Sequence, residues 1–277
     1  MNNLDIYKEA LLWYLKAPKR KICEILAQMR KNRCRFRKDK INDETYTIRN
    51  GAVIESCCFE GFENLKIIKI ENDFNIDKDR YTRFGSFTPN LEQFHVISKK
   101  SPFFTENGVL YLNIEKARKK EKDCPELNYF LDNCEVPEKL SGNMLVYMPP
   151  NYKDSSFVVP DFVEVIGCAA FCGSNLESLT IPDSVKFIGM GGLCEMEHLK
   201  ELKVPNKPVY VCWDQSCVGH DIDILCSETD VELKSELKAF WQHLLVENKY
   251  DKEVLKPIVS EFGIASKKVE RDDPFGI

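Results

Sequence analysis

Apolar residues recur between Phe157 and Val204 with a period of roughly 22 residues, a length typical of solenoid repeats. The recurring positions are Ile166, Phe171, Leu176, Leu179 and Ile181 in one unit and Ile188, Leu193, Leu199, Leu202 and Val204 in the next. In a solenoid each coil is too small to bury its own apolar face and stacks on its neighbours. The pattern therefore predicts a stack of short coils.

The spacing inside one unit predicts a short strand. In Leu176-Glu177-Ser178-Leu179-Thr180-Ile181 the first, fourth and sixth positions are apolar. Side chains alternate along a strand, so the fourth and sixth positions face the interior while the third and fifth face outward. Pro182 then ends the strand, because proline has no amide hydrogen to donate.

Two stretches carry a family resemblance. Thr180-Ile181-Pro182-Asp183-Ser184-Val185-Lys186-Phe187-Ile188-Gly189 and Gly167-Cys168-Ala169-Ala170-Phe171-Cys172 resemble the repeat of the BspA-type leucine-rich repeat family. The resemblance implies an α/β leucine-rich-repeat solenoid of short stacked strands, turns and half-turn helices. Apolar residues at helical spacing before residue 45 and after residue 226 predict helical N- and C-terminal caps that flank it. The resemblance also implies a protein-binding scaffold, and many members of the family are cell-surface or secreted proteins.

The same spacing starts earlier in the chain. Ile54, Phe59, Leu65, Ile68 and Ile70 reproduce the unit, and Phe87, Leu91, Phe94 and Val96 form a looser one after an insertion. We expect Leu65, Leu91, Leu176 and Leu199 to line up along one common interior. Asn64, Asn90 and Asn175 precede the first strand leucine, with His198 in the fourth unit, where a side chain can hydrogen-bond the backbone of its own turn.

These patterns divide the chain into six segments. The segments are a basic helical N-terminal cap (1–45), a first repeat block (46–100), a hairpin with a charged insertion (101–156), a second repeat block (157–226), a C-terminal helical cap (227–263) and a tail (264–277). The hairpin turns at Asn107-Gly108, a favoured tight-turn pair. Thr229 and Glu232 have the spacing of a capping box for a helix that carries Val231 among its apolar residues.

Composition and charge narrow the picture. The 277 residues are 43% apolar, which indicates a globular chain, and no run of 18 apolar residues predicts a membrane span. The first stretch does not resemble a secretory leader, which favours a cytoplasmic protein, whereas the family resemblance implies a secreted or surface location. In a reducing compartment the 12 cysteines are expected to be small core thiols.

The positive charge is concentrated near the N-terminus. Residues 1–45 carry 12 lysines and arginines against 6 acidic residues. The densest run contains Arg30, Lys31, Arg33, Arg35, Arg37, Lys38 and Lys40. Such a cluster can follow phosphates, so binding of nucleic acid or another anionic surface through residues 30–40 is the alternative function.

Little in the sequence indicates catalysis or a bound cofactor. Cys212, Cys217 and His220 are the one local cluster of catalytic residue types, and with Cys226 they could bind zinc. No Cys-x-x-Cys pair occurs, and proximity in sequence does not place a thiol and a base in hydrogen-bond reach. We therefore expect no enzyme activity, no metal and no cofactor.

The predicted function is a non-catalytic scaffold for protein–protein interaction. The outward positions of the strands would form a ladder on the open face if all units stack in one sheet. These positions are Ile67, Lys69, Gln93, His95, Ser178, Thr180, Glu201 and Lys203. We expect them to contact a protein partner whose identity the sequence does not give.

Overall fold

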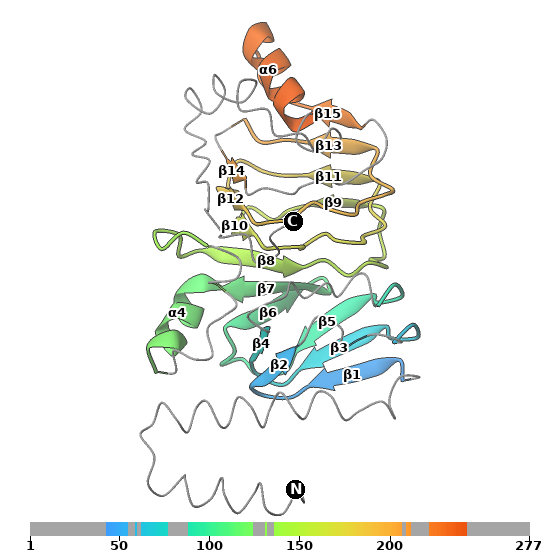
Figure 1. Ribbon diagram of the computed structural model, residues 1–277, viewed down its shortest axis with the longest axis vertical. Coiled ribbons are helices and arrows are strands. Elements are labelled where there is room, and N and C mark those ends of the chain that lie inside the picture. Colours follow the sequence, from blue (N-terminus) through green and yellow to red (C-terminus); the bar gives the residue numbers. More distant parts are fainter. Residues whose placement is uncertain are drawn as a thin grey trace, which may run out of the picture.

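The computed structural model describes residues 43–54, 59, 62–76, 88–123, 131, 136–206, 209–211 and 222–242. This part of the chain consists mainly of short strands that form a solenoid, with two helices (Figure 1). The predicted N-terminal cap up to residue 42, and every predicted element after residue 242, lie outside the described residues.

The first repeat block contains two parallel sheets. Strands β1 (Thr45–Ile48), β3 (Ile67–Ile70) and β5 (Gln93–Val96) form one sheet. Strands β2 (Ala52–Ile54) and β4 (Phe74–Ile76) form the other. Because each strand pairs with its equivalent one coil later, the sheets run along the stack rather than within one coil.

The second repeat block has the same design. One sheet contains β9 (Ser156–Val158), β11 (Ser178–Thr180), β13 (Glu201–Lys203) and β15 (Asp223–Leu225). The other side of the coils contributes β10 (Val163–Ile166), β12 (Phe187–Ile188) and β14 (Tyr210–Val211). Leu179 pairs with Leu202 and Leu202 with Ile224, so equivalent residues stack directly.

A mixed sheet joins the two blocks. Strands β6 (Phe103–Glu106) and β7 (Val109–Asn113) are antiparallel, and Asn107 and Gly108 form the turn between them. Strand β8 (Asn143–Tyr147) pairs antiparallel with β7 and parallel with β10. The result is a six-stranded sheet in the order β14-β12-β10-β8-β7-β6 that runs through the middle of the molecule (Figure 1).

Both faces of this six-stranded sheet are buried at strand β7. In β7, Val109 and Tyr111 belong to the core of the second block, whereas Leu110 and Leu112 belong to the core of the first block. All four side chains are at most 1% exposed. Since successive side chains of a strand point to opposite faces, β7 lies between two apolar cores and contributes residues to both.

The single interior expected from the sequence is therefore replaced by two. Leu65 and Leu91 lie in the first core, and Leu176 and Leu199 lie in the second. The physical reason is the antiparallel hairpin of β6 and β7, which interrupts the run of parallel coils and places apolar residues on both of its faces. Within each block the expected stacking of the leucines is present.

Helix α4 (Ile114–Asp123) lies in the predicted charged insertion. Its N-terminus is capped by the Asn113 side chain, which accepts a hydrogen bond from the Lys116 amide at 2.8 Å. Arg118 donates to the carbonyl groups of three residues that precede β8, namely Pro137, Glu138 and Leu140. The helix is thereby fastened to the segment that leads into the six-stranded sheet.

Helix α6 (Val231–Gln242) packs on β15 at the end of the second block. Leu237 and Trp241 are buried in the second core, but Val231 is 83% exposed, contrary to its predicted place on the apolar face. The reason is rotational, since six residues at 100° each turn Val231 about 120° away from Leu237. The helix also starts later than the predicted capping box requires, and the Glu228 carboxylate accepts hydrogen bonds from the amides of residues 229 and 230 instead.

Candidate functional site

The outward side chains of β1, β3 and β5 form one exposed surface, here termed the first strand face. Its two rows are Thr45, Ile67 and Gln93, and Thr47, Lys69 and His95. Ile68 and Phe94, which alternate with these residues, are at most 1% exposed. The alternation predicted for these strands is therefore present, with Lys69 and His95 the most exposed of the four predicted contact residues.

The outward side chains of β9, β11, β13 and β15 form the second strand face. Its two rows are Ser156, Ser178, Glu201 and Asp223, and Val158, Thr180, Lys203 and Leu225. Leu179 and Leu202 lie between the rows and are completely buried. Four parallel strands in unbroken register thus place two straight rows of side chains at the surface.

The structure does not bring all eight predicted contact residues onto one sheet. Ile67, Lys69, Gln93 and His95 lie on the first strand face, whereas Ser178, Thr180, Glu201 and Lys203 lie on the second. The turn of the β6–β7 hairpin closes the edge of the first sheet, because the Phe94 amide donates to the Gly108 carbonyl at 2.8 Å. A Cβ atom at Gly108 would lie only 2.9 Å from the Gln93 Cβ, so the turn covers that side chain closely.

The second strand face combines apolar, hydroxyl and charged groups. Val158 is 65% exposed and pairs with Thr180. Thr180 in turn pairs with Lys203, so the three residues follow one another in the same row. In the other row the Ser178 hydroxyl donates to the Glu201 carboxylate at 3.0 Å, which orients that acid beside Asp223. The surface therefore offers an apolar contact at one end and acidic groups toward the other.

Sequence reasoning missed four residues of the second strand face. Ser156 and Val158 belong to a strand that precedes the first clear repeat, and Asp223 and Leu225 belong to one that follows the last. The spacing was a usable signal, since Ser156 precedes Ser178, and Asp223 follows Glu201, by the length of one repeat. Extending the period by one unit in each direction locates both strands.

One of the asparagine positions, Asn90, makes a structural contact, with a different partner from the one expected. The Asn90 side-chain amide donates to the carbonyl of Glu63 at 2.8 Å, which belongs to the preceding coil rather than to its own turn. Asn64, Asn175 and His198 are exposed at equivalent places. At Asn90 the side chain thus links its own coil to the preceding one.

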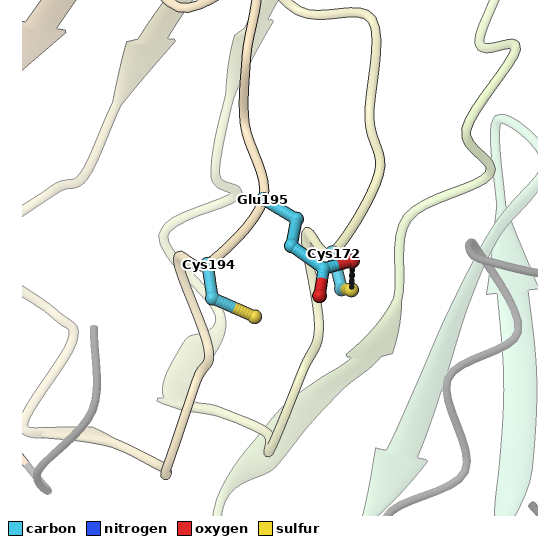
Figure 2. A group of neighbouring side chains, drawn as sticks. All are labelled: Cys172, Cys194 and Glu195. Carbon is cyan, nitrogen blue, oxygen red and sulfur yellow. Dashed lines mark hydrogen bonds between the residues drawn. The ribbon is translucent and has the colours of Figure 1, made fainter. Parts of the chain in front are cut away.

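A second group of polar side chains lies away from both faces. Cys172, Cys194 and Glu195 come from two stacked turns, and their sulfur and carboxylate atoms lie within 4.8 Å of one another (Figure 2). The Cys172 thiol donates to the Glu195 carboxylate at 2.9 Å. Its hydrogen bond with Cys194 and its burial raise the pKa of Cys172 well above the ordinary value of a thiol.

Several predicted site residues lie outside the described residues. These residues include the basic run from Arg30 to Lys40. They also include Cys212, Cys217 and His220 of the catalytic and zinc hypotheses. Cys226 is described, and it is a buried thiol at 6% exposure whose sulfur lies 3.5 Å from the Asn206 amide oxygen. The anion-binding alternative and the Cys/His hypotheses stay predictions.

Comparisons with known proteins agree with the architecture. Residues 151–213, which cover most of the second block, match the family described as "BspA type Leucine rich repeat region (6 copies)". The stacked coils and this match show that the second block has the leucine-rich-repeat fold. The repeats in residues 151–213 match the BspA type, which confirms the resemblance carried by Thr180 to Gly189.

Three solved structures are similar at low identity. The pneumococcal vaccine antigen PcpA is 15% identical with a TM-score of 0.37, over 58% of this chain and 39% of its own. A leucine rich cell surface protein from Faecalibacterium prausnitzii A2-165 is 13% identical with a TM-score of 0.38, over 75% and 63%. A leucine-rich repeat protein from Eubacterium ventriosum ATCC 27560 is 14% identical with a TM-score of 0.30, over 66% and 63%.

The chain spans less than two thirds of the length of each of these three proteins. No curated protein matches the chain. In the described part of the chain, neither helix has the length and apolar character that crossing a membrane requires.

Proposed function

We propose that the protein binds a protein partner on the second strand face and performs no reaction of its own. One observation carries the proposal, namely two straight rows of side chains on four parallel strands in unbroken register. The paired strands fix the backbone from which these side chains project, so little backbone conformational entropy is lost on association. The BspA-type repeats support a scaffold role.

The second face suits a partner better than the first for two reasons. It has four strands rather than three, and the hairpin turn that approaches Gln93 reduces the open area of the first face. It also has a mixed chemistry, with Val158 as an apolar contact and with Glu201 and Asp223 as acidic groups. The partner surface that fits is apolar opposite Val158 and basic opposite the two acids.

Crosslinking from single positions tests the proposal in cells that make the protein. A photoreactive residue at position 180 lies in the middle of the second face, and one at position 119 lies on helix α4 as a matched surface control. We expect one protein to crosslink to position 180 and not to position 119. Mass spectrometry of the crosslinked band identifies that protein, which is then purified.

Affinity measurements with the purified partner complete the test. Glu201→Lys reverses a charge in the centre of the face, whereas Glu115→Lys makes the same change on α4, where the glutamate side chain is 61% exposed. We expect the first change to weaken binding by roughly tenfold or more and the second to leave it within about twofold. Equal effects of the two changes, or the same crosslinks from both positions, would contradict the proposal.

The predicted cytoplasmic location and the surface location implied by the family stay open alternatives for where this contact takes place. The proposal is the same in both compartments, because it depends only on the strand face.

A further inference from the structure

The turns that follow β10 and β12 are built alike and stack on each other. Three amides of the first turn, at Ala169, Phe171 and Gly173, donate to carbonyls of the second at 3.0 to 3.1 Å. Cys172 and Cys194 occupy equivalent positions in successive repeats, as do Gly173 and Glu195. The stacking therefore places two thiols side by side on a fixed backbone.

The Glu195 carboxylate adds a third possible metal ligand, and its residue has an unusual backbone conformation. Its φ is 53°, in the left-handed region, and the equivalent residue one coil earlier is a glycine with φ of 74°. Left-handed conformations are unfavourable for residues that have a Cβ atom. Here the conformation directs the carboxylate back to the Cys172 sulfur, 2.9 Å away, and toward Cys194 (Figure 2).

From this geometry we propose that Cys172, Cys194 and Glu195 form a binding site for a thiophilic divalent cation, with Zn²⁺ as the best fit. Two sulfurs and one carboxylate oxygen are donors that zinc uses in proteins, at about 2.3 Å and 2.0–2.2 Å respectively. Tetrahedral bonds of these lengths separate the donor atoms by roughly 3.4–3.8 Å. The three atoms already lie within 4.8 Å of one another, so a shift of about an ångström or less closes the site.

The environment provides both shielding and access. Cys172 is completely buried and Cys194 is 8% exposed, while Glu195 is half-buried and leads to the solvent. An ion reaches the sulfurs from the Glu195 side, and each thiol releases its proton to water as its sulfur coordinates the cation. A water molecule supplies the fourth ligand of the tetrahedron. The two charged sulfurs and the carboxylate then share a dication instead of being buried as separate anions.

Metal content of the purified full-length chain tests the proposal. The wild-type protein and its variants are reduced, incubated with Zn²⁺ or Co²⁺, desalted, and analysed for bound metal. The test variant is Cys172→Ala with Cys194→Ala, and the matched control is Cys168→Ala, which removes a thiol of the same turn that is not one of the three proposed ligands. We expect the wild type and the control to retain one more equivalent of metal than the double variant. Their cobalt forms should show sulfur-to-cobalt charge-transfer absorption that the double variant lacks.

Two further variants keep the test decisive if the double variant folds poorly. Cys194→Ala removes the less buried thiol, and Glu195→Gln removes only the negative oxygen. We expect the first to lose the additional equivalent and the second to bind zinc more weakly while it keeps the cobalt absorption. Zinc should also raise the thermal midpoint of the wild type but not of Cys194→Ala.

Four results would overturn the proposal. One is equal metal content in the wild type and the double variant, and another is unchanged zinc affinity in Glu195→Gln. A third is a zinc-induced shift of the thermal midpoint that persists in Cys194→Ala. The fourth is a peptide map of the unreduced protein in which Cys172 and Cys194 are joined by a disulfide, because these residues would then not form a cation site.

Discussion

The two repeat blocks differ in the regularity of their coils. In the first block the interval from Ile67 to its partner Gln93 is longer than the interval from Thr45 to Ile67, whereas the paired strands of the second block follow one another at nearly even spacing. Both blocks nevertheless form parallel sheets with the same alternation of buried and outward side chains. Extra residues between strands change only the loop, because pairing depends on the strand itself. Coils therefore form even where the number of residues between strands varies. The family model matches the regular spacing, and only the second block lies largely within that match.

The two cores also differ in how they are filled. In the first core, rings pack on rings: Tyr46 and Phe59 meet edge to face at 5.4 Å between centroids, and Phe74 stacks on Phe103 at 4.6 Å. The second core contains mostly leucine, isoleucine and valine, with Phe171 as one of few large rings. Aromatic side chains bury more area each, so a few of them can fill coils of unequal length. Regular coils are filled by repeated aliphatic residues.

The largest expected effects come from removing one ring from each core. Phe94→Ala and Phe171→Ala each delete a side chain that is at most 1% exposed, so each should lower the free energy of unfolding by about 3–5 kcal/mol. Urea unfolding followed by circular dichroism measures both. If the aromatic core adapts better, Phe94→Ala will fall at the low end of this range. A loss below about 1 kcal/mol at either position would show that its core is not packed as described.

Aliphatic positions of the second block should be nearly as sensitive. Leu179→Ala or Leu202→Ala should cost about 2–5 kcal/mol, because each side chain is completely buried between two coils. Thr180→Ala and Lys203→Ala, the outward neighbours, should stay within about 0.5 kcal/mol. The same urea experiment compares them, and equal losses at the buried and outward positions would be incompatible with the assigned faces.

We expect a loss of stability of intermediate size from a substitution in the insertion between the blocks. Arg118 donates to three carbonyl groups ahead of β8, and a charged donor of this kind contributes about 1.5–3 kcal/mol per hydrogen bond when its partners cannot turn to water. The side chain is partly exposed, so we expect Arg118→Ala to cost about 1.5–3 kcal/mol in total. Lys119→Ala on the exposed side of α4 is the matched control. If both variants unfold at the same urea concentration, α4 does not fasten the insertion.

The sequence predicted the coils well because their signal is local. Six residues are enough to predict a strand and its buried face, as the spacing of Leu176, Leu179 and Ile181 shows. The repeat period then predicts where the equivalent strands lie in the stack. The division into two cores depends instead on contacts across long separations. Val109-Leu110-Tyr111-Leu112 is apolar at every position, a pattern that indicates a strand buried on both faces and thus a core on each side.

The two candidate sites differ in the same way. The second strand face follows from alternation plus the period, which could have located Val158 and Asp223 as well. The cysteine cluster follows only in part, since the spacing of Cys172 and Cys194 predicts that they stack. The contribution of Glu195 requires a left-handed φ at a residue other than glycine, and the sequence pattern does not predict that.

Glycines with a left-handed backbone conformation occur in turns of both blocks, so the same substitution can be compared in each, with a smaller expected loss of stability. Gly51 follows β1 with φ of 67°, and Gly173 lies in the turn after β10 with φ of 74°. Alanine at either position should cost about 1–2 kcal/mol, because its Cβ atom is unfavourable in this conformation. Asn175→Ala, an exposed change two residues after Gly173, is the control. Thermal unfolding distinguishes the blocks, and a cost at Gly173 alone would mean that only the regular coils depend on such turns.

The smallest expected effect concerns ion pairs between neighbouring coils. Lys186 lies 2.6 Å from Glu164 in the second block, and Lys66 lies 2.8 Å from Glu44 in the first, each pair joining one coil to the next. The hydrogen bond from Lys186 holds the pKa of Glu164 below its ordinary value, and the Gly142 amide adds to this effect at 3.0 Å. A lowered folded-state pKa stabilises the protein above the unfolded pKa, and this contribution is lost as the pH falls through the folded value.

Glu164→Gln should therefore lower the free energy of unfolding at pH 7 by about 1 kcal/mol or less, and the difference from the wild type should disappear in acid below the ordinary glutamate range. Glu44→Gln should have no measurable effect, because its carboxylate is 66% exposed and water screens the pair. Urea unfolding of both variants from pH 7 down to about pH 3 separates the two cases, since that interval spans the ordinary glutamate pKa. A loss from Glu164→Gln that persists unchanged in acid would come from packing around Gly142 rather than from charge. An equal loss from Glu44→Gln would mean that ion pairs between coils contribute alike in the irregular and the regular block.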